Sequence, residues 1–342
     1  TLVALAPLYL KGHSYGEFVF DQSFARLAAQ LGLRYYPKLV GMSPVSPVEG
    51  YRFLLAPEGD PAALTARLFH HIEVFCQRQK VLSCNLLYVD PGFAREAQDS
   101  GWSLWVNEQS EWSNAGFREF EDYLATFNAN QRRNIRRERK AVAETGITVT
   151  PLTGDAISPE LMDRMHTFYA QHCSRWGPWG SKYLSEDFFS AAAARLTSNL
   201  VLFSAHLGDP YSPIAMSFCV HNGNQLWGRY WGSDVEVNHL HFEVCYYSPL
   251  EWAIQNQLRS FDPGAGGSHK KRRGFVAKPR FSVHRWFEPR FAAILQEWLP
   301  GANQQMEEEI AALNADLPFS ATYDPPTAHE RPANLPSSPP FP

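Results

Sequence analysis

IAMSFCVHNGNQLWGRYWG, residues 214–232, is the stretch of this chain that most narrowly restricts its fold. It contains two runs of alternating apolar side chains, separated by His221-Asn222-Gly223-Asn224. An Asn-Gly pair between such runs is the strongest short-range sign of a β-hairpin, because both residues tolerate the positive φ angles of a tight turn. We therefore predict antiparallel strands over Ile214–His221 and Gln225–Gly232.

Further strands and helices are predicted on both sides of this hairpin. Towards the C-terminus, apolar spacing predicts a helix over Phe242–Gln257, a strand over Leu258–Asp262 and a glycine-rich basic loop over Pro263–Arg273. Towards the N-terminus it predicts a strand, two helices and a strand, at residues 147–150, 159–173, 185–196 and 199–207. The second half of the chain is therefore expected to be α/β with a mostly antiparallel sheet.

The first half shows a similar mixture of elements. Strands are predicted at 1–9, 17–21, 51–55, 81–89 and 102–106, and amphipathic helices at 62–78 and, near the C-terminus, 290–313. A helical and increasingly basic stretch at 117–144 indicates a boundary between two domains. We expect domains over 1–127 and 128–299, a C-terminal helix end over 300–320, and a disordered proline-rich tail over 321–342.

Composition excludes several classes of protein. Hydrophobic residues make up 44% of the 342 residues, which suits a globular chain, and the net charge of -4 argues against a surface coated with positive charge for nucleic acid. Five cysteines without a CxxC pair suit a reducing compartment. We find no apolar run long enough for a transmembrane segment and no signal peptide after Thr1, so we expect a cytoplasmic protein.

A basic segment at Gln131–Lys140 is the first candidate for anion binding. On a helix its arginines form two neighbouring rows, Arg132 with Arg136 and Arg133 with Arg137. Guanidinium groups offer paired donors to phosphates and carboxylates. A solvated basic face, paired with nearby glutamates, explains the same pattern.

The hairpin exit and the start of the next helix form the second candidate. Glycines bracket Arg229, Tyr230 and Trp231, so a ligand can approach the strand closely. His241 and Glu243 open the following helix, where the dipole favours an anion. Amide formation needs a base for the attacking ammonium, and either residue suits that role. Alternatively, Glu243 stabilises its helix and His241 acts as a cap.

A metal site in this segment is not favoured. The spacing of His239, His241 and Cys245 allows one, but no matching carboxylate or cysteine motif accompanies these residues. We therefore predict no metal.

The loop Asp262–Phe275 is the third candidate. It places several glycines beside His269, Lys270 and Arg273, and exposed backbone N-H groups next to cations make an anion cradle. The loop lacks the residue order of a P-loop or of a dinucleotide fingerprint. A flexible basic surface loop is the competing interpretation.

The fourth candidate is the polar cluster Lys11, His13, Tyr15 and Glu17, followed by Tyr35-Tyr36-Pro37-Lys38. An ordinary connecting loop does not require these residue types together, and binding residues concentrate on loops. We expect this cluster to bind substrate.

Taken together, these segments resemble the FemAB-like peptidoglycan biosynthesis/recognition family of the GNAT (N-acyltransferase) superfamily. The resemblance extends from Thr1 to about Leu299 and lies in seven phrases, at Pro7–Asp21, Tyr35–Leu39, Arg132–Lys140, Gly228–Gly232, His241–Tyr247, Gly267–Phe275 and Ser282–Trp286. It implies an α/β (α+β) fold of tandem GNAT-like domains, with mostly antiparallel sheets flanked by helices and a first domain truncated at its N-terminus. FemAB-type relatives transfer amino acids from aminoacyl-tRNA to the amine of a peptidoglycan precursor.

The resemblance implies acyl or aminoacyl transfer to an amine of an anionic, cell-wall-related substrate. Glu243, His241 or His269 would be the base, Tyr230 would give polar support, and Arg229, Lys270 and Arg273 would orient the substrate. No cofactor is certain. The donor would be an acyl-CoA or an aminoacyl-tRNA, so tRNA is a conceivable partner.

Two features set this chain apart. It lacks the acetyl-CoA pyrophosphate signature before Phe242, and it has Gly266 and Ser268 where many relatives carry Gln and Glu.

A recognition protein without catalysis and an RNA-binding module are the alternatives to a transferase. The transferase hypothesis requires Arg229, Glu243 and Lys270 to share one cavity.

Overall fold

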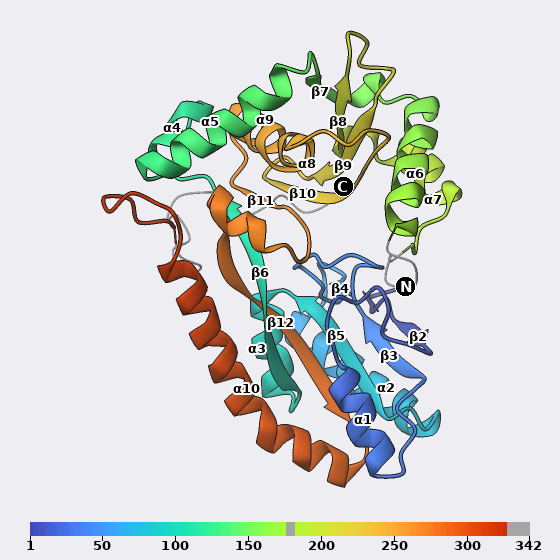
Figure 1. Ribbon diagram of the computed structural model, residues 1–342. Coiled ribbons are helices and arrows are strands. Elements are labelled where there is room, and N and C mark those ends of the chain that lie inside the picture. The colour runs from blue at the N-terminus through green and yellow to red at the C-terminus, as the bar shows by residue number, and fades with distance from the viewer. Residues whose placement is uncertain (176–181, 327–342) are drawn as a thin grey trace.

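A mixed ten-stranded sheet extends through the computed structural model, which describes residues 1–175 and 182–326 (Figure 1). From one edge to the other, its strands are β2 (Tyr9–Lys11), β3 (Lys38–Gly41), β5 (Ser83–Val89), β12 (Val276–Trp286), β6 (Ser103–Ser113), β11 (Ser260–Asp262), β10 (Gln225–Ser233), β9 (Ala215–His221), β8 (Leu200–His206) and β7 (Thr148–Thr153). A separate antiparallel pair joins β1 (Ala4–Leu5) to β4 (Leu54–Leu55).

The same pairing pattern occurs on both sides of the central β12–β6 pair. On one side β3 and β5 are parallel, and on the other β10 and β11 are parallel. Each inner strand, β5 or β11, then pairs antiparallel with a central strand. β12 follows the second half in sequence yet pairs with β5, whereas β6 precedes the second half and pairs with β11. The two halves therefore exchange a strand, which makes the sheet continuous.

Helices cover both faces of the sheet. In the first half, α2 (Pro61–Arg78) and α3 (Pro91–Asp99) pack on one face, and α1 (Gln22–Gln30) and α10 (Pro289–Ala315) on the other. In the second half, one face carries α6 (Pro159–Ser174) and α7 (Glu186–Arg195), and the other carries α4 (Phe120–Ala125), α5 (Ala129–Ala143) and α9 (Ser248–Gln255). The predicted fold class, α/β with a mostly antiparallel sheet flanked by helices, is confirmed.

The elements around the predicted hairpin form as expected. β9 and β10 pair antiparallel from Leu226 opposite His221 to Ser233 opposite Ala215. The register shifts between Gly228 and Tyr230, so this strand contains a β-bulge.

The structure differs from the prediction in several elements, of which three matter most here. The sequence reading assigned no strand to Val276–Trp286 and placed it in the second domain, whereas β12 pairs with β5 and β6 of the first half. Residues 17–21 form no strand, because Phe18 has a φ of 57° and the carboxylates beside it turn inward. The helix predicted at 117–144 is two helices, and the Asn128 side chain caps the second by accepting from the Gln131 N-H at 3.0 Å. The domain limits themselves stay a prediction.

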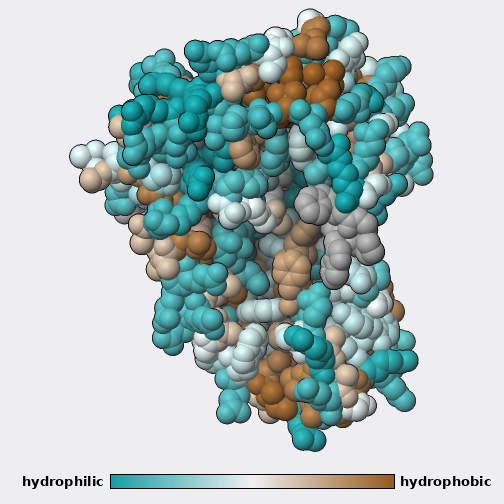
Figure 2. Space-filling model, in the orientation of Figure 1, coloured by the Kyte–Doolittle hydropathy of each residue, from teal (hydrophilic) through white to brown (hydrophobic). Residues whose placement is uncertain are grey.

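The surface and the C-terminal segment complete the description. Figure 2 shows hydrophilic residues over most of one face, with hydrophobic side chains gathered near its upper and lower ends. No helix within residues 1–175 and 182–326 has both the length and the apolar character to cross a bilayer. Of the tail predicted at 321–342, residues 327–342 lie outside the described residues, while Tyr323 packs against Phe319 with ring centroids 4.9 Å apart.

Candidate functional site

A cavity of about 670 Å³ opens where β10 and β11 diverge. The two strands are paired only from Gln225–Trp227 to Ser260–Asp262, and beyond this point β10 continues with β9 alone. We call this space the Arg229 cavity. It is lined by His172, Ser217, Cys219, Gly228, Arg229, Tyr230, Trp231, His241, Cys245, Tyr246, Pro263, Ala265, Gly266, Gly267 and His269. The hairpin, the start of the following helix and the glycine loop therefore meet at one cavity, as the sequence predicted.

The β-bulge positions Arg229. A bulge leaves one residue without a partner in the ladder and turns its side chain, and such bulges are common beside active sites. The Arg229 Nη2 donates to the Val45 carbonyl oxygen at 3.4 Å, a long hydrogen bond. Its Nε is buried and meets no hydrogen-bond partner among the described residues. The guanidinium also lies beside the Tyr230 ring, with 5.6 Å between Cζ and the ring centre, so Nε is the donor that the described part of the protein leaves without a partner.

His269 lines the same cavity from the short 3-10 helix Ser268–Arg273. Its Nε2 lies 2.8 Å from the Tyr246 hydroxyl oxygen. Burial, and then the charges of Arg273 and Lys270, lower the pKa of His269. The imidazole is therefore neutral at pH 7 and able to accept a proton.

A glycine sets the place of this imidazole. Gly267 has a φ of 93°, and a Cβ added there would lie 2.8 Å from the His269 Cε1. A contact under 3.0 Å forces a shift, so the ring packs against a position that only glycine fills without displacement.

His241 is neutral but a much weaker base. Its ring lies against Trp231, with centroids 4.5 Å apart. Burial is the main reason that its pKa is lowered to about 3, and His269 and His172 contribute as well. Of the two histidines, His269 is therefore the better match to a reaction at neutral pH.

The helix that carries His241 contains a π-turn. Between α8 (Leu240–Phe242) and α9 lies a π-helix over Glu243–Tyr247. A π-turn puts residues five apart on one face, and the rings of His241 and Tyr246 indeed meet with centroids 5.4 Å apart. Tyr246 thereby reaches both histidines, and such insertions often occur at functional sites.

Glu243 does not reach the Arg229 cavity, and Lys270 does not line it either, so the expectation that Arg229, Glu243 and Lys270 share one cavity is wrong. The Glu243 carboxylate accepts from the Arg139 Nη2 at 2.9 Å and from the Ser248 hydroxyl at 3.0 Å. It lines a different cavity of about 610 Å³, together with Arg139 and Glu251. The buried carboxylate is drawn to this side because Arg139, on α5, provides its charge partner.

Lys270 and Arg273 are buried and hold the loop; they line the cavity on the other side of that loop, and substrate binding by them stays a prediction. The Lys270 ammonium donates to the Gly264 carbonyl, and burial is the main reason that its pKa is lowered to about 8. Arg273 donates to Glu138 at 2.6 Å and to the His269 carbonyl at 2.9 Å, and it lies 3.4 Å from the centre of the Phe242 ring. Each side chain is only 2% exposed. Both therefore fix the conformation of the loop.

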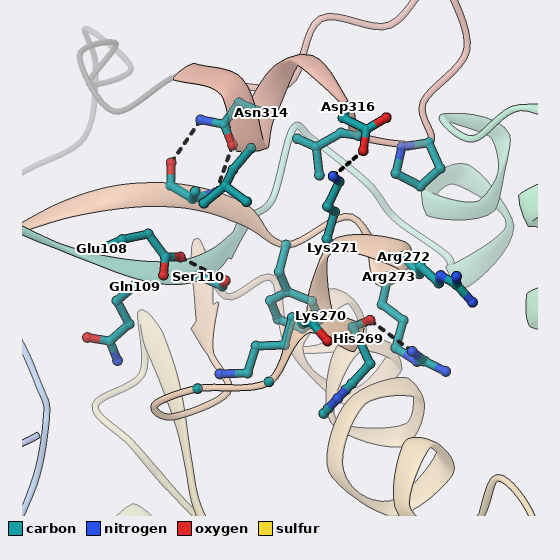
Figure 3. Close-up of a pocket in the computed structure, with 18 of the residues that line it drawn as sticks. Glu108, Gln109, Ser110, His269, Lys270, Lys271, Arg272, Arg273, Asn314 and Asp316 are labelled. Atoms are coloured by element: carbon teal, nitrogen blue, oxygen red, sulfur yellow. Dashed lines mark hydrogen bonds and ion pairs between the residues drawn. The ribbon is translucent and has the colours of Figure 1, made fainter. Parts of the chain in front are cut away.

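A neighbouring cavity of about 790 Å³ lies on the other side of this loop (Figure 3). We call it the Lys271 cavity. It shares Gly266, Gly267 and His269 with the Arg229 cavity. In Figure 3 Lys270 extends along the glycine loop, whereas Lys271 points to Asp316, with which it forms an ion pair. The glycine loop thus separates two spaces.

The arginines of the basic helix do not line the Arg229 cavity. Arg132 donates to the Phe127 carbonyl at 2.7 Å, Arg133 contacts Asn130, and Arg136 pairs with Glu121 at 2.6 Å on the surface. Arg136 also lines the cavity of Glu243, and Arg137 is exposed. Anion binding by these residues stays a prediction.

The polar cluster of the first half is largely an internal ion network. Lys38 is fully buried and pairs with Glu17 at 2.6 Å and with Asp21. The Tyr35 and Ser14 hydroxyls each donate to Asp21 at 2.6 Å. Burial by itself would raise the pKa of Asp21, but Lys38 and these hydroxyls outweigh it and hold the pKa below its ordinary value.

The four residues of this cluster that were predicted to bind substrate lie partly in that network and partly on the surface. Glu17 is 1% exposed and its second oxygen lies 3.1 Å from Lys11. His13 and Tyr15 lie on the surface. None of the four lines the Arg229 cavity.

Several residues of the site were not predicted. His172 lines the Arg229 cavity with its ring 5.5 Å from that of Trp231, and burial lowers its pKa. Tyr246 forms a hydrogen bond with His269. Glu138 pairs with Arg273, and Arg139 pairs with Glu243. Tyr246 lies within a phrase the sequence reading quoted, but its role depends on the π-turn. Within the described residues, no group of three or more His, Cys, Asp or Glu side chains has an arrangement suited to a metal ion.

A family model supplies the relationship of the chain to known proteins. The model of the FemAB-like family, described as peptidoglycan biosynthesis/recognition, matches residues 1–321. The chain belongs to the FemAB-like family. No curated protein matches this FemAB-like chain significantly.

Several solved structures are similar to this FemAB-like protein. L-PGS from Bacillus licheniformis is 11% identical, with a TM-score of 0.49 and 84% of each chain covered. The C-terminal domain of a putative lysylphosphatidylglycerol synthetase from Agrobacterium fabrum is 11% identical, with a TM-score of 0.48, and 70% of this chain and 78% of that chain are covered. FemX is 10% identical, with a TM-score of 0.46, and 75% of this chain and 86% of that chain are covered.

Proposed function

We propose that this FemAB-like protein transfers an acyl or aminoacyl group to an amine of a cell-envelope substrate, and that the reaction takes place in the Arg229 cavity. The observation that carries the proposal is the neutral His269, hydrogen bonded to Tyr246 and facing a cavity that also holds Arg229 and Tyr230. Membership of a family described as peptidoglycan biosynthesis/recognition supports the cell-envelope substrate.

The residues of the cavity suit the steps of such a transfer. The amine nitrogen attacks the carbonyl carbon of a thioester or ester, and the bond from that carbon to sulfur or oxygen breaks. His269 accepts the proton of the attacking nitrogen and returns it to the departing thiol or alcohol. Tyr246 holds the imidazole in place through the 2.8 Å contact.

We assign the donors for the tetrahedral oxyanion to Tyr230 and to the glycine loop beside His269. Burial raises the pKa of Tyr230, so its hydroxyl keeps its proton and is able to donate. The N-H groups of Gly266 and Gly267 make no backbone hydrogen bond to the described residues. Successive glycines with positive φ direct such N-H groups towards a ligand, and these two have φ angles of 69° and 93°.

The donor is a substrate of the cavity and not a resident cofactor. An acyl-CoA and an aminoacyl-tRNA both carry an activated carbonyl attached to a large anionic handle. The Lys271 cavity lies next to the reaction space and is lined by the basic residues 270–273 together with Glu108, Glu138 and Asp316. Arg272 supports the placing of an anionic handle there, while Lys271 is already paired with Asp316.

A His269→Gln variant tests the assignment of the base. We expect it to lower kcat for acylation of an amine by a simple acyl thioester about 10²- to 10⁴-fold. The wild-type rate should also fall as pH drops through the lowered pKa of His269, because protonated imidazole accepts no proton. His71→Gln, an exposed histidine on α2, is the matched control. Retention of the wild-type rate by His269→Gln would remove His269 from the mechanism.

A recognition protein without catalysis is the second candidate. It is favoured by the placement of Glu243, since this expected carboxylate base is bound to Arg139 and faces away from the Arg229 cavity. The two functions are separated by mass spectrometry of a mixture of protein, thioester and amine. Tight binding of the amine without any acylated product would support recognition alone.

A further inference from the structure

The charge of the Arg229 cavity is not balanced by its own walls. Among the described residues that line it, Arg229 carries a full positive charge and none is Asp or Glu. Residues 176–181, outside the described part, read Trp-Gly-Pro-Trp-Gly-Ser and add no carboxylate in sequence.

The nearest carboxylates of the surrounding elements are engaged elsewhere. Glu243 pairs with Arg139 on the far side of its helix. Asp262 accepts from the Gln109 side chain at 2.8 Å and from the Gly264 N-H at 2.8 Å. Neither lines the Arg229 cavity. The negative partner of Arg229 must therefore come with the ligand.

Arg229 is also placed to receive such a partner. Its Nε is buried without a hydrogen-bond partner among the described residues, and its bond to the Val45 carbonyl is 3.4 Å long. The Tyr230 side chain lies beside the same guanidinium, 5.6 Å from ring centre to Cζ, so Nε is the donor that a ligand would satisfy. A guanidinium binds a carboxylate through two parallel hydrogen bonds, which would satisfy this donor.

The positive charge of the cavity is unfavourable for an amine acceptor, and a carboxylate on the same molecule removes this repulsion. A free alkyl amine is an ammonium at pH 7, and a positively charged cavity repels it. A carboxylate on the same molecule makes the acceptor neutral overall and gives Arg229 its missing anion. Near this positive charge the amine also loses its proton more readily, which makes it nucleophilic.

We infer that the acceptor is a zwitterion: an amino-acid-like or peptide-like amine whose carboxylate pairs with Arg229. The inference rests on the proposed function for the identity of the reaction, but the carboxylate site itself is measurable by binding. The aromatic side chains of Tyr230, Trp231 and Tyr246 provide the surface for the less polar part of this molecule.

Matched acceptors test the inference on the full chain. Alanyl-alanine, alanyl-alaninamide and a phosphonate analogue of alanyl-alanine are compared, with the acetyl thioester of N-acetylcysteamine as donor. Binding of each acceptor is measured by calorimetry, and acylation by mass spectrometry. Both are repeated with Arg229→Gln, Arg229→Lys and Arg67→Gln, the last an exposed arginine on α2 as charge-matched control.

We expect the wild type and Arg67→Gln to bind the carboxylate dipeptide about 10- to 100-fold more tightly than the amide, the range for a hydrogen bond to a charged group. Arg229→Gln should abolish this preference and Arg229→Lys should retain part of it. The thermal unfolding of both variants establishes that they are folded.

Four results would overturn the inference: equal binding of dipeptide and amide by the wild type, a preference that survives in Arg229→Gln, tighter binding of the phosphonate than of the carboxylate, or no detectable binding of any acceptor. Carboxylate-dependent binding without acylated product would refute the transfer reaction and leave the carboxylate site standing. Equal acylation of dipeptide and amide would refute the carboxylate site and leave the transfer standing.

Discussion

Gly267 offers a sharp test of the site, because the three atoms nearest to a methyl group added there all belong to His269. A Cβ at this position would lie 2.8 Å from the His269 Cε1 and 3.2 Å from its Nε2. Ordinary contact begins at 3.4 Å, so the ring has to move by about 0.6 Å. A movement of this size stretches the 2.8 Å bond from Nε2 to Tyr246 beyond good hydrogen-bond geometry.

The expected effect of Gly267→Ala is a loss of rate larger than the loss of stability. Misplacement of a catalytic group by about 1 Å costs on the order of 10²-fold, so we expect kcat for acyl transfer to fall about 10- to 100-fold. With φ 93° and ψ 96°, Gly267 lies outside the regions that residues with a Cβ favour, so the variant also bears backbone strain of roughly 1–3 kcal/mol. Steady-state kinetics and thermal unfolding measure the two effects separately.

Gly266→Ala is the matched control. Gly266 also has a positive φ, of 69°, so alanine there is strained too, but its added Cβ would meet nothing within 4 Å. We expect it to lose stability too, but far less rate. Equal losses of kcat in the two variants would show that loop strain, and not the place of His269, sets the rate. Wild-type kcat in Gly267→Ala would contradict the role of His269 in the reaction.

Two further changes test the ion pairs that the fold buries. Glu243→Gln should weaken the pairing with Arg139 and lower stability by about 1–3 kcal/mol. It should change kcat less than tenfold, because this side chain does not line the Arg229 cavity. A loss of activity comparable to that of His269→Gln would show that Glu243 acts in the reaction. Lys38→Met leaves Glu17 and Asp21 buried without their cation and should cost about 3–5 kcal/mol at pH 7 by denaturant unfolding. In the wild type the lowered pKa of Asp21 contributes stability that is present at neutral pH and lost as pH falls, while burial already holds the pKa of Glu17 above its ordinary value. In Lys38→Met the pKa of Asp21 should rise above its unfolded value and that of Glu17 should rise further, so the variant loses stability as pH rises. The destabilisation measured at pH 5 should therefore be smaller than at pH 7, and an equal or larger one would refute the charge argument.

Much of the site was predictable because its signals are local. The Asn-Gly turn, the glycines around Arg229 and the glycine-rich loop are each read within a few residues of chain. They correctly indicated that the hairpin, the helix start and the loop contribute to one cavity. What local spacing did not show is which face each polar side chain takes. Lys270 and Arg273 have the composition of an anion cradle, but burial assigned them to the loop itself.

The sequence by itself determined the hairpin, most of the helices, the class of the fold and the segments that surround the cavity, since periodicity and turn chemistry act over short distances. Tertiary structure alone decided the pairing of β12 with β5 and β6, and the turn of Glu243 towards Arg139, 104 residues away in the chain. It also decided which histidine is a suitable base, because the pKa of a side chain depends on burial and on charges that only folding brings near. These are contacts between segments far apart in sequence, and their energies exist only once the sheet has formed.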